Sequence, residues 1–188
     1  MKIVEMSLAG VFRIELDPRT DDRGFFVRTY DRQIFKDHGL STDWQQESHA
    51  YSKQKGIIRG LHLQLPPFTE TKLVMVIKGA ILDAFVDVRP ESPTYGKWDS
   101  ILLTESNYHC LYLPRGFAHS YCTLEDNCDV VYKMDNIYNP QFEAGIIWND
   151  PNIAIQWPVS NPVVSAKDLK LPTFEEFKKQ YAALNFNF

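Results

Sequence analysis

The chain has little cysteine, and its three thiols fit neither a metal site nor a disulfide framework. Cys110, Cys122 and Cys128 make an odd count and lack the paired spacing of a zinc site. Reduced thiols are typical of the cytoplasm, because disulfides persist mainly in oxidising compartments. The first residues, 1–6, also lack the apolar stretch of a signal peptide. We therefore expect a cytoplasmic protein.

Long apolar runs and an excess of positive charge are missing too. No stretch of the sequence is apolar over the length needed to cross a bilayer. The formal net charge is −4, whereas a protein that binds nucleic-acid phosphates needs a surplus of Lys and Arg. The sequence thus predicts neither a membrane span nor a nucleic-acid partner.

The composition supports one hydrophobic core. The 188 residues are 44% hydrophobic and 13% aromatic, which suits a single domain. Within it, residues 1–55 form N-terminal strands, residues 56–135 the core, and residues 136–188 a loop-rich and helical C-terminal region.

Short strand patterns recur at roughly ten-residue spacing with turn residues between them, which is typical of a sandwich or barrel. The predicted strands cover residues 1–16 (one or two edge strands), 25–30, 56–64, 72–78, 80–89, 99–104, 109–113, 120–124 and 129–134, and residues 44–52 form an extended segment.

Two helices are predicted beside these strands. One spans residues 31–37 and is capped by Asp31. The other follows Thr173 and Glu176, which form a capping box. The apolar face of this C-terminal helix consists of Phe174, Phe177, Tyr181 and Leu184.

Residues 56–64 place polar side chains inside an otherwise apolar strand. His62 and Gln64 share one face of this strand, since side chains alternate. Gly60 often marks a bulge, and a bulge would turn Arg59 onto the face of His62. Such a face suggests the lining of a site, although a single histidine on a strand is more often a hydrogen-bonded structural residue.

Residues 114–119 read Pro-Arg-Gly-Phe-Ala-His, the Pro-x-Gly-x-x-His form seen in cupin jelly rolls; the alternative is a turn followed by a hydrogen-bonded His119. A metal-binding cupin would also have a His-x-His pair, but the chain has His62-Leu63-Gln64. Two imidazoles are too few ligands for a stable site, so we expect no metal. The fold class that follows is all-β, a cupin-like double-stranded β-helix (jelly roll) with short helices and a C-terminal helix.

Four more residues have both a structural and a functional interpretation. Lys72 opens a strand, where it is either a solvated strand end or a cation that stabilises an oxyanion. Tyr132 lies between apolar residues, where it is either an aromatic residue of the core or a phenol that lines the site. Tyr138 lies on a loop where its ring can stack on a base or sugar. Asp168, taken alone, suggests a helix cap or a surface acid.

These segments belong to an ordered series of blocks that resembles the dTDP-4-dehydrorhamnose 3,5-epimerases over about residues 10–170. The series is specific although each block alone is weak. The blocks are Arg59-Gly60-Leu61-His62-Leu63-Gln64, Lys72-Leu73-Val74, Val86-Asp87-Val88-Arg89, Ser92-Pro93-Thr94-Tyr95-Gly96-Lys97-Trp98, Pro114-Arg115-Gly116-Phe117-Ala118-His119, Tyr132-Lys133, Tyr138-Asn139-Pro140 and Trp148-Asn149-Asp150-Pro151.

The resemblance implies a homodimer without metal or cofactor that acts on a nucleotide-diphosphate-linked 4-keto-6-deoxyhexose. The hydrogens at C3 and C5 of such a sugar are acidic, because the adjacent ketone can become an enolate. By resemblance, His62 is the base and is oriented by Asp168. Tyr132 returns a proton from the opposite face, and Lys72 stabilises the enolate.

The resemblance also assigns binding roles. Arg23, Arg59 and Lys167 would meet the diphosphate or the sugar, as cations suited to such contacts. Tyr138 would stack on the base. Family dimers exchange N-terminal strands, so Arg23 would serve the neighbouring subunit's site. The implied substrate-binding set is Arg23, Arg28, Gln46, Ser48, Arg59, His119, Tyr138, Glu143 and Lys167.

Three places depart from the family pattern. Arg28 stands where a glutamate is usual, and Ser48 replaces an amide. Ser120 and Tyr121 follow His119 in place of Gly-Phe, which adds bulk beside the sugar pocket. These departures leave the nucleotide, the sugar and the number of epimerised carbons open.

Other functions are possible for such a fold. A C3-only epimerase would have the same proton-transfer residues. A related 3,4-ketoisomerase typically has a different histidine arrangement, and a sugar-binding jelly roll would not need His62, Lys72, Tyr132 and Asp168 together. A metal-dependent cupin oxygenase is the most distant alternative.

Overall fold

The structure, a computed structural model, describes residues 1–181. Its elements follow the strand pattern of the sequence, in which β-branched and aromatic residues alternate between turns. The strands are β1 (Lys2–Glu5), β2 (Phe12–Glu15), β3 (Arg19–Asp21), β4 (Gly24–Phe26), β5 (Gln46–Ser52), β6 (Ile57–Gln64), β7 (Lys72–Lys78), β8 (Ala80–Asp87), β9 (Trp98–Thr104), β10 (His109–Leu113), β11 (Phe117–Thr123), β12 (Cys128–Met134), β13 (Glu143–Gly145) and β14 (Val163–Val164). The helices are α1 (Arg32–Asp37), the short 3-10 helix η1 (Asp168–Lys170) and α2 (Phe174–Tyr181).

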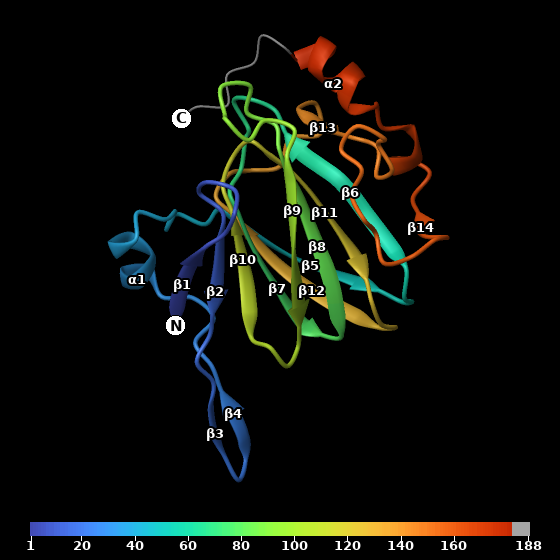
Figure 1. The fold of residues 1–188 in the computed structure, drawn as a ribbon. Coiled ribbons are helices and arrows are strands. Elements are labelled where there is room, and N and C mark those ends of the chain that lie inside the picture. The colour runs from blue at the N-terminus through green and yellow to red at the C-terminus, as the bar shows by residue number, and fades with distance from the viewer. Residues whose placement is uncertain (182–188) are drawn as a thin grey trace.

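Two six-stranded sheets face each other and enclose the main core (Figure 1). The first sheet has the order β1-β2-β10-β7-β12-β5, and the second has the order β13-β6-β11-β8-β9, with β14 paired to β6. All pairs are antiparallel except β14 with β6. Val74 of the first sheet and Phe85 of the second are fully buried between the sheets. The predicted all-β jelly roll is confirmed.

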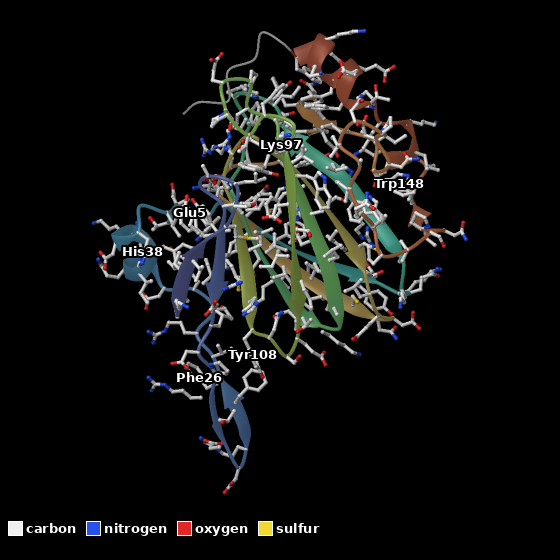
Figure 2. The ribbon with its side chains drawn as sticks, viewed as in Figure 1. Glu5, Phe26, His38, Lys97, Tyr108 and Trp148 are labelled. Atoms are coloured by element: carbon white, nitrogen blue, oxygen red, sulfur yellow. The ribbon has the colours of Figure 1, made fainter. Side chains whose placement is uncertain are left out.

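A two-stranded arm, formed by β3 and β4, projects away from the two sheets (Figure 1). Figure 2 shows Phe26 on this arm. Its neighbour Phe25 meets the ring of Tyr108 edge-on, with 5.3 Å between ring centroids. Both phenylalanines remain exposed, by 58% for Phe25 and 68% for Phe26. The arm therefore presents apolar rings to solvent in the single chain.

Two predicted strands are shorter than the sequence pattern indicated. The prediction for residues 25–30 was wrong beyond Phe26, because residues 27–30 are irregular and lead into α1, which Asp31 caps through the N–H groups of Gln33 and Ile34. The strand predicted to reach Arg89 ends at Asp87. There the Asp87 carboxylate accepts hydrogen bonds from the backbone and side chain of Arg89.

The C-terminal helix packs on the second sheet as predicted. Thr173 and Glu176 form the capping box, with the Thr173 N–H donating to Glu176 Oε2 at 2.8 Å and the Glu176 N–H donating to Thr173 Oγ1 at 3.3 Å. Phe174 and Phe177 are buried in a cluster that covers the outer side of β6. Leu184, the fourth residue of the predicted face, lies outside the described residues. None of the helices within residues 1–181 has the length and apolar character needed to cross a bilayer.

Candidate functional site

A bulge in β6 brings two polar residues to one side of the strand. His62 pairs with His119 of β11, and Arg59 pairs with Tyr121, so that two residues of β6 face the single residue Ser120. Gly60, inside this bulge, has a φ of +114°, and a Cβ there would lie 2.5 Å from the carbonyl oxygen of His119. Only glycine fits this conformation and this approach. The predicted bulge is confirmed, and it turns Arg59 and His62 towards the same cavity.

His62 forms a close pair with Asp168, which is 106 residues further along the chain. The Nε2 atom of His62 lies 2.7 Å from Asp168 Oδ1. The Gly60 N–H donates to Asp168 Oδ2 at 3.2 Å. Burial alone would raise the pKa of Asp168, but the hydrogen bond from His62, together with its charge and the Gly60 N–H, holds that pKa below its ordinary value. Asp168 is therefore a carboxylate at neutral pH that fixes the orientation of the imidazole.

Two adjoining cavities, with volumes of about 470 and 570 Å³, share His62 in their walls. His62, Lys72 and Tyr132 line both of them. Among the predicted site residues, the first cavity is also lined by Arg59, His119, Lys167 and Asp168, and the second by Gln46, Ser48, Tyr138 and Glu143.

The residues shared by the two cavities come from opposite sheets. His62 lies on β6 of the second sheet, whereas Lys72 lies on β7 and Tyr132 on β12 of the first. β7 and β12 pair directly, with Tyr132 opposite Val74. An imidazole therefore faces an ammonium and a phenol across the space between the two walls.

The ammonium of Lys72 has an acidic neighbour within the second cavity. Its Nζ atom lies 3.2 Å from Glu70 Oε1, and both side chains are largely buried. Glu70 also accepts a hydrogen bond from Gln64 Nε2 at 2.9 Å. The Lys72 ammonium is thereby held at the cavity wall by an ion pair.

A second histidine–aspartate pair lies beside the first cavity. His119 Nε2 and the carboxylate of Asp83 on β8 are 2.9 Å apart. Asp83 is fully buried, and burial raises its pKa against the opposing influence of His119 and of the Lys72 charge. This pair fixes the His119 ring at the cavity wall.

A polar cluster joins residues of the two cavities: Tyr138 and Glu143 line the second, and Lys167 lines the first. The Tyr138 hydroxyl donates to Glu143 Oε2 at 2.7 Å, and Lys167 Nζ lies 2.6 Å from both Glu143 oxygens. Burial acts to raise the pKa of Glu143, but Lys167 and Tyr138 together hold it below its ordinary value. The backbone N–H of Tyr138 donates to Gln46 Oε1 at 2.8 Å. These contacts hold an exposed aromatic ring and an exposed cation beside the cavities.

Comparison with known proteins identifies the family. A family model described as dTDP-4-dehydrorhamnose 3,5-epimerase matches residues 5–176. The chain belongs to this family. A Shigella flexneri protein named dTDP-4-dehydrorhamnose 3,5-epimerase is 39% identical over 170 residues, which cover 90% of this chain and 93% of that protein.

Two solved structures of epimerases have closely similar folds. That of dTDP-4-dehydrorhamnose 3,5-epimerase from Bacillus anthracis, with TDP and PPi bound, has a TM-score of 0.90 and 39% identity, and covers 92% of this chain and 99% of that one. The structure of dTDP-6-deoxy-D-glucose-3,5-epimerase from Legionella pneumophila, in complex with dTDP-4-keto-L-rhamnose, has a TM-score of 0.92 and 32% identity. The match covers 100% of this chain and 98% of that one.

Two residues assigned by the epimerase resemblance lie apart from the cavities of their own chain. Arg23 sits on the arm and pairs with Asp21 at 2.6 Å. Arg28 pairs with Asp31 at 3.1 Å and lines a separate hollow of about 190 Å³. The single chain therefore brings together the other eleven predicted site residues without these two.

Glu70 and Asp83 were not predicted as site residues from the sequence. Asp83 had a signal, because a lone carboxylate inside the apolar run of β8 must find a partner when it is buried. Glu70 lies two residues before Lys72 and so lies on the same side of an extended chain. Within residues 1–181, no cluster of three or more His, Cys, Asp or Glu side chains is arranged to hold a metal ion.

Proposed function

We propose that this member of the epimerase family inverts C3 and C5 of dTDP-4-dehydro-6-deoxy-D-glucose by proton transfer next to the C4 ketone. The observation that carries the proposal is the His62–Asp168 pair, 2.7 Å apart, in a cavity whose facing wall supplies Lys72 and Tyr132. The dTDP-4-keto-L-rhamnose and TDP in the two related structures support a thymidine nucleotide.

Each step can be assigned to a side chain. When His62 Nε2–H donates to Asp168, the other ring nitrogen, Nδ1, keeps a lone pair that can accept the proton from C3 or C5. The electron pair of the broken C–H bond moves into the C4 carbonyl and forms an enolate. The Lys72 ammonium stabilises the enolate oxygen.

Inversion follows if the proton returns from the other side of the ring. Tyr132, on the wall facing His62, gives its phenolic proton to the carbon as the enolate collapses to the ketone. His62 is then protonated and Tyr132 is a phenolate, and proton exchange with solvent restores both. The same set serves C3 and C5, since both carbons flank C4.

The polar groups around the two cavities suit the rest of the substrate. Arg59 and Lys167 are cations of the first cavity, in addition to Lys72, that suit the diphosphate or the sugar. His119 and Glu143 offer hydrogen bonds, and Tyr138 offers a ring face for the base. Gln46 and Ser48 line the second cavity beside Tyr138.

The decisive experiment follows the loss of ring protons by NMR in D₂O. The wild-type protein is incubated separately with dTDP-, CDP- and GDP-linked 4-keto-6-deoxyhexoses. Exchange at both C3 and C5 of the dTDP sugar is the expected result. Exchange at C3 alone would make the protein a C3 epimerase, a carbonyl at C3 would make it a ketoisomerase, and no reaction would reject an enzymatic function on these sugars.

Two variants separate the steps. His62→Asn should lower exchange roughly 10²–10⁴-fold, because it removes the base. The matched control is His49→Asn, since His49 also lies 2.7 Å from an aspartate, Asp129, but lines neither cavity and is 59% exposed. The control should keep full activity. Tyr132→Phe should reduce inversion more than exchange, because deprotonation by His62 survives.

We also propose that the protein works as a homodimer in which the arm serves the partner's site. The exposed Phe25 and Phe26 on the arm support this, as does the position of Arg23 away from the cavities of its own chain. Mixing Arg23→Ala with His62→Asn under refolding conditions tests it. A heterodimer would have one intact site, so activity should recover; no recovery would reject the exchange.

A cytoplasmic location is proposed on the three cysteines, which are free and buried. Burial raises the pKa of Cys110 to about 12 and that of Cys122 to about 11, so these two thiols remain protonated and unreactive. Fractionation of cells that express the tagged chain would test the location, and recovery with the membrane fraction or outside the cells would reject it.

A further inference from the structure

Glu70 is a charged residue of the second cavity that the proposed proton-transfer steps do not use. It lines this cavity together with Gln64, Lys72 and Tyr132. The Glu70 side chain is 10% exposed, and that of Lys72 is 13% exposed. Protein interiors tolerate a carboxylate and an ammonium when the two charges pair. Glu70 and Lys72 therefore depend on each other within the cavity wall.

The amide of Gln64 holds the Glu70 carboxylate from one side. Gln64 Nε2 donates to Glu70 Oε2 at 2.9 Å and to the carbonyl oxygen of Phe68 at 3.0 Å. The amide oxygen accepts the backbone N–H of Asn139 at 2.6 Å, which fixes the nitrogen on the side of Glu70. Gln64 is itself only 4% exposed. The carboxylate is therefore anchored to a side chain whose own orientation is fixed.

The other oxygen of Glu70 is directed at the ammonium of Lys72. Glu70 Oε1 lies 3.2 Å from Lys72 Nζ, and among residues 1–181 Glu70 is the one carboxylate that forms an ion pair with Lys72. The Lys72 charge also acts on Asp83, but the Asp83 carboxylate is held by His119 at 2.9 Å. Because the lysine stem is long and flexible, the carboxylate that pairs with the ammonium decides where it lies.

We propose that Glu70 is a positioning residue, which holds the Lys72 ammonium at the place where the C4 oxygen of the bound hexose is polarised. This inference rests on the proposed function. An ammonium has three N–H donors, so one can stay on Glu70 while another meets the oxygen on which the enolate charge develops. A stabilising charge is most effective when it is in place before the reaction begins. Glu70 therefore acts on the rate through Lys72 and transfers no proton itself.

The test compares Glu70→Gln with Asp87→Asn, a matched change from a carboxylate to an amide. Asp87 is also buried and pairs with Arg89 at 2.7 Å, but it lines neither cavity. Glutamine keeps the size of Glu70, yet its NH₂ group would face one of the two donors, Gln64 or Lys72. Measured for each variant are the thermal unfolding temperature and the kcat and KM of ring-proton exchange with dTDP-4-keto-6-deoxyglucose.

The two variants should differ in kcat. Glu70→Gln should lower kcat roughly tenfold to hundredfold, since a catalytic group displaced by about 1 Å loses rate on this scale, and should change KM much less. Asp87→Asn should lower the unfolding temperature and keep kcat. A further measurement adds Glu70→Gln to a chain that already carries Lys72→Gln. There it should cost no additional rate, because the cation through which Glu70 acts is gone.

Three results would overturn the inference. An unchanged or higher kcat in Glu70→Gln would show that the carboxylate does not place the cation for catalysis. An equal fall of kcat in Asp87→Asn would reduce the effect to a loss of stability. The same loss of rate with and without Lys72→Gln would show that Glu70 acts on a group other than Lys72.

A second variant and the wild type keep the outcome decisive. If Glu70→Gln does not fold, Glu70→Asp takes its place, because it keeps the charge and shortens the side chain by one methylene. It should also lower kcat through Lys72, and an unchanged kcat would overturn the inference. If wild-type protein exchanges no ring proton, the proposed function itself fails before the variants are compared.

Discussion

Replacing Asp168 by asparagine tests whether the carboxylate beside His62 drives proton abstraction. When His62 accepts a proton from the sugar it becomes a cation, and Asp168 lies 2.7 Å from its Nε2 atom. Asparagine keeps the shape of the side chain and an oxygen that can still accept from the Gly60 N–H. The substitution therefore removes mainly the negative charge.

The size of the effect follows from the distance and the exposure. With about 4 Å between charge centres, an ion pair near a protein surface interacts by about 4 kcal/mol. The His62 side chain is 32% exposed, and solvent screening lowers this to about 2–3 kcal/mol. Since each 1.36 kcal/mol changes a rate about tenfold, kcat should fall roughly 30- to 150-fold.

The assay is the initial rate of ring-proton exchange in D₂O at saturating substrate. Asp150→Asn is the matched control, because Asp150 is as buried as Asp168, at 3% against 4%, and accepts the N–H groups of Ile153 and Phe174 outside the cavities. It should lower stability and leave kcat unchanged. An Asp168→Asn variant that keeps more than about a third of the wild-type rate, or an equal loss of rate in both variants, would refute this role of the Asp168 charge.

Three further predictions concern Lys72 in the cavity wall, Gly60 in the bulge of β6 and Asp87 at the end of β8. Lys72→Gln should lower the exchange rate about 10²–10³-fold, as removal of an oxyanion-stabilising donor does, and should change the substrate KM much less. A rise in KM as large as the fall in rate would contradict that role. Gly60→Ala should destabilise the chain by roughly 1–3 kcal/mol in urea unfolding, because its Cβ would lie 2.5 Å from the His119 carbonyl oxygen at a φ of +114°. Asp87→Asn should lower stability at pH 7 by roughly 3 kcal/mol, since it breaks a buried pair with Arg89. Burial acts to raise the pKa of Asp87, but its hydrogen bonds, led by that with Arg89, hold the pKa below its ordinary value. Asp87 therefore contributes its full stabilisation above the pKa that it has in the unfolded chain, ~4. This stabilisation is lost as the pH falls through the lower pKa that Asp87 has in the folded protein. Urea unfolding between about pH 5 and pH 2 should show a smaller fall in the variant than in the wild type, and parallel curves would disprove the assignment.

The sequence by itself determined the strand pattern and, through the family resemblance, eleven of the residues that line the two cavities. Alternation and turn residues are local properties, so they placed β6, β7 and the bulge at Gly60 without reference to the rest of the chain. They failed at residues 27–30, where the capping of α1 by Asp31 overrides a strand-like composition. Local pattern thus decides which elements form, except where a neighbouring cap competes for the backbone.

Only the tertiary structure decided which side chains meet. The 2.7 Å between His62 and Asp168 joins positions 106 residues apart, and no periodicity of the sequence encodes such a distance. The same holds for the 2.9 Å between His119 and Asp83, which are 36 residues apart. Contacts across two facing sheets depend on how the sheets pack, which is a property of the whole chain, whereas alternation along one strand depends only on the strand itself.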